Sequence, residues 1–200
     1  MNRIVTLATA FALTLSFAAC KKKEGDAGGG GGSASSAKVP TMTVTAADWV
    51  EQDLKTVSPL VNLTMKVPKD AKLEKNGNGG VDVLVNDFYM LTVSNLAVSN
   101  VAEAIQSDKS LTIENSSYMN GKVVSEEPNG FIYTYQMKDE ANGTKYQPET
   151  HFAYYVEKDG AIYSIQDQKP MKAFSTPGSA YTEATAKSVY EIVKSSAKAN

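Results

Sequence analysis

Residues 151–166, HFAYYVEKDGAIYSIQ, carry the strongest local folding signal of the chain. The dipeptide Asp159-Gly160 is typical of a two-residue β-hairpin turn, because such a turn needs positive φ at both positions. A two-residue turn places Val156 opposite Tyr163 and fixes the register of both strands. One side of the predicted hairpin is then apolar throughout. That side consists of Phe152, Tyr154, Val156, Tyr163 and Ile165.

Alternation of apolar and polar residues predicts further half-buried strands before this hairpin. The segments that alternate are residues 61–67, 81–85, 89–93 and 131–136. Turn sequences lie between them, NGNGG at residues 76–80 and PNG at residues 128–130. The strands are therefore expected to follow one another as an antiparallel meander.

Three helices are expected around these strands. Thr45 to Asp48 has the spacing of a helix N-cap, and Val50, Leu54 and Val57 form a stripe of helical period that ends at Pro59. This pattern predicts an N-terminal helix.

A second capping box, from Asn100 to Glu103, predicts a short middle helix that ends near Ser107. Thr176-Pro177 predicts the start of a C-terminal helix. The residues that this last helix offers to the sheet are Tyr181, Thr185, Val189, Ile192 and Val193.

These elements predict a single α+β domain over residues 41–200, an antiparallel β-sheet meander packed against N-terminal, middle and C-terminal helices. Their order, with the sequence KVPKD at residues 66–70 ending the first strand, resembles the PsbP-like fold, which a Ran-binding nuclear import factor shares. The resemblance covers residues 44–196. It implies a role in assembly or binding, because members of that fold act mostly in this way, and it transfers no functional residue.

Residues 1–19 have the pattern of a secretory signal peptide, a positive start followed by a short apolar run. Phe17-Ala18-Ala19-Cys20 then resembles the lipobox of bacterial lipoproteins, although that family usually has Leu where Phe17 stands. The resemblance implies a diacylglyceryl group on the Cys20 sulfur, removal of the leader and acylation of the new amine with a fatty acid such as palmitate. The alternative is a plain signal peptide cleaved after Ala19.

Residues 20–40 follow as the lipidated cysteine and a flexible tether, since the Gly/Ser-rich sequence EGDAGGGGGSASSA cannot bury apolar surface. Several acyl chains on one cysteine make a stable membrane anchor. Lipoproteins with Asp after the cysteine commonly stay at the inner membrane, and Lys21 stands there instead. The resemblance therefore favours the outer membrane, with the domain on the periplasmic side of the cell envelope.

Composition and charge exclude two classes of protein. With 42% hydrophobic and 21% charged residues, the 200-residue chain is not a polytopic membrane protein. From Val39 onward it has 15 lysines against 20 acidic residues, and its only arginine is Arg3. Because arginine is the usual residue for recognising phosphate and guanine, no nucleic-acid partner is expected.

The sequence offers little catalytic or metal-binding chemistry. Cys20 is the only cysteine and is assigned to lipidation, so neither a disulfide nor a cysteine metal site is expected. His151 is the only histidine, and the hairpin register places it with Ala153, Tyr155 and Glu157 on the more polar face. No serine lies in a nucleophile-elbow sequence. We therefore expect no catalytic residue, no metal and no cofactor.

Three functions remain open from the sequence. The leading interpretation is a non-enzymatic lipoprotein that binds or helps assemble another envelope component. The alternative is a lipoprotein that binds a small ligand or glycan through exposed tyrosines, which predicts a concave pocket lined by two or three of them. An enzyme would need His151 beside a carboxylate and a nucleophile in one cleft.

Overall fold

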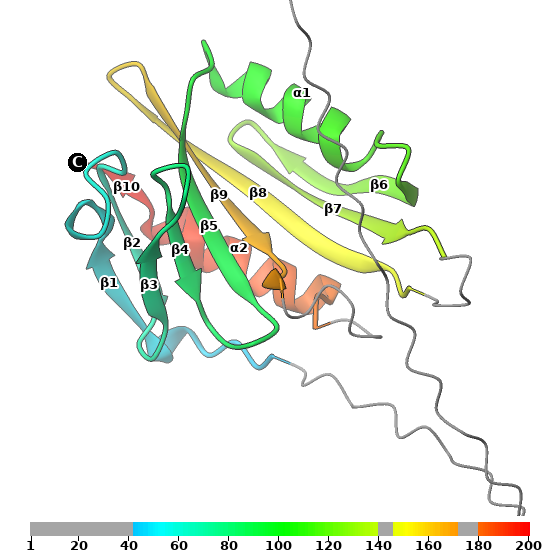
Figure 1. Ribbon diagram of the computed structural model, residues 1–200, viewed down its shortest axis with the longest axis horizontal. Helices are drawn as coiled ribbons and strands as arrows, with labels where there is room; N and C mark the ends of the chain where they lie inside the picture. The colour runs from blue at the N-terminus through cyan, green and yellow to red at the C-terminus, as the bar shows by residue number, and fades with distance from the viewer. Residues whose placement is uncertain (1–41, 140–145, 172–179) are drawn as a thin grey trace, which may run out of the picture. The chain divides into compact units, whose positions relative to one another are not determined.

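The computed structural model describes residues 42–139, 146–171 and 180–200 (Figure 1), and these residues belong to one compact unit. The predicted signal peptide, Cys20 and the tether lie outside the described residues. In chain order the elements are two 3₁₀ turns, Ala46–Asp48 and Leu54–Thr56, the strands β1 Trp49–Asp53, β2 Leu63–Pro68, β3 Lys72–Lys75, β4 Val81–Leu84, β5 Met90–Leu96, β6 Tyr118–Glu127, β7 Gly130–Met137, β8 Glu149–Lys158, β9 Ala161–Gln168 and β10 Lys198–Ala199, and the helices α1 Val101–Thr112 and α2 Glu183–Ser196.

The strands form two antiparallel sheets, which confirms the α+β class and the single domain. Seven strands make the large sheet in the order β3-β4-β5-β9-β8-β7-β6, and β1, β2 and β10 make a small one. The hairpin of β8 and β9 has the predicted register, since Val156 lies opposite Tyr163. Its turn residues have positive φ, 52° at Asp159 and 79° at Gly160, as a type I′ turn requires.

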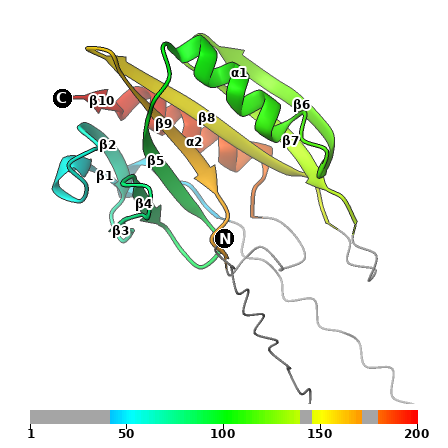
Figure 2. The ribbon, with the colours of Figure 1, turned by 45° about the horizontal axis from the view of Figure 1, so that its top comes forward.

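Helices α1 and α2 lie on opposite faces of the large sheet (Figures 1 and 2). The apolar side of the hairpin packs against α2 and the small sheet in the main core. The other side packs against α1, and Ala153 and Tyr155 are buried there. This second face, although it contains the more polar residues, is therefore buried as well, because α1 covers it.

The predicted N-terminal helix is wrong. Residues 49–53 are strand β1, which pairs along its whole length with β2. Trp49 is buried and Val50 is exposed, as alternation along a strand requires, so the helical stripe does not describe this segment. The backbone groups of β2 need a partner on this side, and β1 supplies it. Only the isolated turns at residues 46–48 and 54–56 are helical, with 3₁₀ geometry.

The other two predicted helices are present with different limits. Asn100 caps α1 by accepting a hydrogen bond from Glu103 N (2.9 Å), but the helix continues to Thr112 instead of ending near Ser107. Residues 176–177 lie outside the described part of the chain, and α2 begins at Glu183 with Thr182 as its N-cap. Tyr181 therefore precedes this helix. Within the described residues, neither helix is long and apolar enough to span a bilayer.

The turn of the β8–β9 hairpin provides a test of the fold. Gly160→Ala forces a side chain into a left-handed conformation and should lower the free energy of unfolding by about 1–2 kcal/mol in urea denaturation. Gly77→Ala is the matched control, because a Cβ there meets nothing within 4 Å and its φ is not left-handed. Equal stabilities of the two variants would contradict the assigned turn.

Candidate ligand-binding pocket

Strands β8 and β9 separate in a fork at the end opposite their turn (Figures 1 and 2). Residues that line the candidate site lie on both strands beyond this point. The pairing of β8 and β9 ends at Ala153 and Gln166. Beyond this point β8 continues to pair with β7 as far as Glu149, and β9 continues to pair with β5 as far as Gln168. The fork therefore leaves backbone groups of two central strands without their regular partners.

Asp167 fills the fork with its carboxylate. Its Oδ1 accepts a hydrogen bond from Phe152 N (2.9 Å), a group that has lost its strand partner. Its Oδ2 accepts one from the Tyr89 hydroxyl (3.3 Å). Asp167 is only 3% exposed, so it replaces the missing strand pairing from inside the protein.

His151 lies between two buried carboxylates. Its Nδ1 is 3.3 Å from Asp167 Oδ1, and its Nε2 is 3.3 Å from Glu149 Oε2. The other oxygen of Glu149 pairs with the ammonium group of Lys169, whose side chain is only 6% exposed. Two cations and two anions thus neutralise one another, which a buried charge requires.

This arrangement determines the charge of the imidazole. Burial lowers the pKa of His151, but the carboxylates of Asp167 and Glu149 outweigh burial and raise that pKa from 6.5 to about 9. Burial alone would raise the pKa of Glu149, whereas the hydrogen bonds from His151 and Lys169 hold it below its ordinary value. His151 is therefore an imidazolium at neutral pH, and both its N–H groups are engaged.

Tyrosine rings stack on both faces of this imidazolium. The centroid of the Tyr135 ring lies 5.1 Å from that of the imidazole, with 9° between the two ring planes. The centroid of the Tyr181 ring lies 4.5 Å from that of the imidazole, with 27° between the planes. Tyr118 extends the stack beyond Tyr135 (4.3 Å), and Tyr89 extends it beyond Tyr181 (4.9 Å). The negative faces of the aromatic rings stabilise the cation between them.

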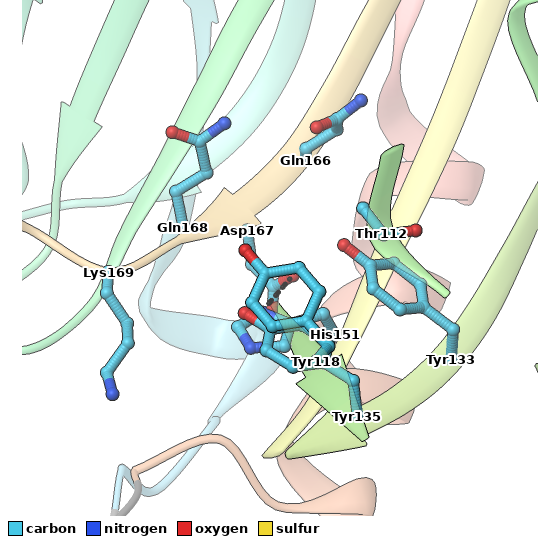
Figure 3. Close-up of a pocket in the computed structure, with 9 residues that line it drawn as sticks. All are labelled: Thr112, Tyr118, Tyr133, Tyr135, His151, Gln166, Asp167, Gln168 and Lys169. Atoms are coloured by element: carbon cyan, nitrogen blue, oxygen red, sulfur yellow. Dashed lines mark ion pairs between the residues drawn. The ribbon is translucent and has the colours of Figure 1, made fainter. Parts of the chain in front are cut away.

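A pocket of about 250 Å³ opens beside the stack. Its lining residues come from α1, β6, β7, β8, β9 and the residue that follows β9 (Figure 3). They are Thr112, Tyr118, Tyr133, Tyr135, His151, Gln166, Asp167, Gln168 and Lys169. The alternative interpretation of the sequence requires a concavity lined by two or three tyrosines, and three tyrosines line this one.

A β-bulge positions Tyr118 over the pocket. The register of β6 shifts between Met119 and Lys122, and Asn120 within this shift has a φ of 58°. A Cβ on Gly121 would lie 2.5 Å from the carbonyl oxygen of Ile113, so the bulge packs tightly against the end of α1. Bulges of this kind re-aim neighbouring side chains. Figure 3 shows the Tyr118 ring lying across His151 and Tyr135.

The end of α1 that reaches the pocket is fixed to the sheet by the half-buried carboxylate of Asp108. Asp108 accepts hydrogen bonds from the Tyr155 hydroxyl and from the side-chain amide of Gln166. Burial raises the pKa of Asp108, although both hydrogen bonds act to lower it. Polar contacts to the sheet thus explain why the helix continues through a segment without a regular apolar stripe.

Two tyrosine hydroxyls in the pocket have no hydrogen-bond partner in the described part of the chain. Neither Tyr133 nor Tyr135 donates or accepts a side-chain hydrogen bond with any described residue, and Tyr133 is only 5% exposed. Every fully buried polar side-chain atom of the described residues has a partner, so the free hydroxyls must open onto the pocket. Burial raises the pKa of both phenols, which stay protonated at neutral pH.

His151 is the one residue of this site that the sequence singles out, and no catalytic role is expected for it. The structure places it at the centre of a charge network. Asp167 was missed, although it continues the apolar period of Tyr163 and Ile165 and so puts a carboxylate at a core position. A charged residue at an apolar position of a strand is thus the feature of the sequence that could identify Asp167 as a site residue. Cys20, the predicted lipidation site, lies outside the described residues.

A metal site or a nucleophile would need particular side chains among the described residues at this site. Among the described residues, no group of ligating side chains suits a metal ion. No serine or cysteine is among the described residues that line the pocket, and the hydroxyl of Thr112 donates to the carbonyl of Asp108.

The raised pKa of His151 predicts a pH dependence of stability. The folded state binds this proton more tightly than the unfolded state, so the stabilisation is complete below pH 6.5 and is lost as the pH rises through about 9. The free energy of unfolding should fall by about 3 kcal/mol over this window in urea denaturation. His151→Gln should be less stable at neutral pH and should lose this slope.

Lys69→Gln is the control for this measurement, because it breaks an ion pair with Asp48 in which both side chains are 55% exposed. It should leave the slope between pH 6.5 and 9 unchanged. The window is specific because the chain has no other histidine. A wild-type stability that stays constant across it would show that His151 is not held as a cation.

Comparison with known proteins assigns no function to this pocket. No protein-family model matches the chain, and no curated protein matches its sequence.

Proposed function

We propose that this chain is a bacterial envelope lipoprotein, anchored through Cys20, whose domain binds a small ligand in the fork between β8 and β9. The observation that carries the binding function is the free hydroxyl of the buried Tyr133, which opens onto a pocket with two further tyrosines. A buried polar group without a partner costs about 1–3 kcal/mol unless water or a ligand satisfies it. The Tyr133 hydroxyl opens onto the pocket, so a bound ligand can take the place of water as its hydrogen-bond partner.

Binding explains the site better than catalysis does. A histidine that acts as a general base needs a free nitrogen, and each nitrogen of His151 faces a carboxylate. Its pKa of about 9 keeps the second proton in place at neutral pH. The carboxylates beside it are equally committed, because Asp167 and Glu149 accept hydrogen bonds from other protein groups. These residues form a rigid, preorganised wall.

The anchor rests on the resemblance of residues 17–20 to a lipobox and on the glycine-rich sequence that follows. Lys21 after the cysteine favours the outer membrane in this proposal. A binding role also agrees with the resemblance to the PsbP-like fold, whose members act mostly as assembly or binding factors. The pocket makes a small molecule the favoured partner over another envelope protein.

The anchor can be tested with Cys20→Ala. The wild-type protein should incorporate radiolabelled palmitate and have an intact mass that lacks residues 1–19. The variant should carry no label and keep its leader, since the lipoprotein family cleaves before a lipidated cysteine. If both proteins are cleaved after Ala19 and neither is labelled, the segment is a plain signal peptide.

The ligand-binding function can be tested with Tyr118→Ala. The lipidated protein, purified in a detergent and mixed with small molecules extracted from envelopes, should retain a discrete adduct in native mass spectrometry. Removing the ring that lies across the pocket should weaken retention by about tenfold, as truncation of a contacting tyrosine commonly does. The same retention in wild type and variant, or none in either, would refute binding in this pocket.

Met119→Ala is the matched control. Met119 is the next residue of the same edge strand, is 38% exposed and does not line the pocket. Its adduct should equal that of the wild type. A loss in both variants would mean that the edge strand itself, and not the pocket, is disturbed.

A further inference from the structure

We infer that the ligand is a neutral, polyhydroxylated ring the size of one sugar residue. The inference rests on the proposed function and specifies the chemistry of that same pocket. It follows from three properties of the lining, namely its paired charges, its free hydroxyls and its volume.

The charges of the lining are already paired within the protein. His151 contacts the carboxylates of Asp167 and Glu149, and Lys169 pairs with Glu149. An anionic ligand would therefore be repelled by the carboxylate of Asp167, with no unpaired cation to neutralise it. A cationic ligand would be repelled by the imidazolium of His151 and the ammonium group of Lys169. An uncharged ligand avoids both costs, because it leaves this balance of charges intact.

The groups left over for recognition are neutral hydroxyls. The hydroxyls of Tyr133 and Tyr135 have no hydrogen-bond partner among the described residues, and Tyr133 is 95% buried. In Figure 3 the Tyr133 hydroxyl points into the lined space from β7. A phenol can donate one hydrogen bond and accept another, which complements a ligand hydroxyl that can do the same.

Aromatic surface completes the match to a sugar. The Tyr118 ring lies across the pocket, and tyrosine rings present a negative face to partially positive hydrogens. The C–H groups on one side of a pyranose ring are such partners, while the hydroxyls at its rim reach polar neighbours. The Tyr118 ring together with the free hydroxyls of Tyr133 and Tyr135 suits this amphipathic ring better than a wholly apolar ligand.

The volume limits the ligand to one ring. The volume of about 250 Å³ lies below the roughly 300–1,000 Å³ of sites for drug-sized ligands. One ring fits such a space. A free monosaccharide and the terminal residue of an envelope glycan share this chemistry.

The test measures binding of defined sugars to the lipidated full-length protein in a detergent without a sugar head group, by isothermal titration calorimetry. The neutral probes are D-glucose, D-galactose, D-mannose and N-acetyl-D-glucosamine. Glucuronate and glucosamine have the same ring but carry a negative and a positive charge. At least one neutral probe should bind, and about tenfold more tightly than either charged one.

Tyr133→Phe removes only the free hydroxyl and should weaken the binding of that neutral sugar by about five- to tenfold. Tyr163→Phe is the matched control, because Tyr163 is also 5% exposed but lies on the opposite face of the sheet. It should bind the sugar like the wild type. Thermal unfolding of both variants shows whether they remain folded.

The methyl glycoside of the bound sugar distinguishes the two sources. Retained binding identifies the end of a glycan, whose ring carries a substituent at this position, and lost binding identifies the free sugar. The inference is overturned if no neutral probe binds, if a charged probe binds more tightly, or if Tyr133→Phe has no effect. If an envelope molecule is still retained in a Tyr118-dependent manner, the proposed function survives that failure.

Discussion

The burial of Asp167 is the constraint on which the rest of this structure depends. Its carboxylate lies where two central strands of the large sheet separate, and it accepts the hydrogen bond that strand pairing would have taken from Phe152. A carboxylate in such a place must be neutralised, which His151 does. The imidazolium in turn needs a second carboxylate, Glu149, and this one needs Lys169. One polar residue at a core position thus explains the whole charge network and the pocket beside it.

Features encoded by neighbouring residues could be predicted from the sequence. The register of the β8–β9 hairpin follows from two turn residues and the apolar alternation beside them. The strands at residues 63–68 and 81–84 have buried side chains at every second position, as predicted, and Leu91 and Val93 of β5 are buried as well. The start of α1 follows from a capping box whose two partners are three residues apart. In each case the stabilising contact lies within a few residues, so that local sequence contains it.

Features that depend on distant partners could not be predicted in this way. Residues 49–53 satisfy a helical period, but β2 imposes a strand on them. Strand β6 shows no alternation, because it lies at an edge and contains bulges, so its sequence does not predict a strand. The candidate site shows the same limit. His151 was visible as a single residue, whereas its partners lie on both sides of the hairpin turn and come together only where β8 and β9 diverge.

The sequence separation between Tyr89 and Asp167 also bears on the order in which the domain can fold. The hairpin closes a two-residue turn, so its strands can meet within microseconds. The hydrogen bond from Tyr89 to Asp167 joins residues 78 positions apart, and ordering so long a loop costs entropy that only a nearly complete sheet can offset. The hydrogen bond from Tyr89, which completes the enclosure of the carboxylate, is therefore expected to form only when the sheet closes.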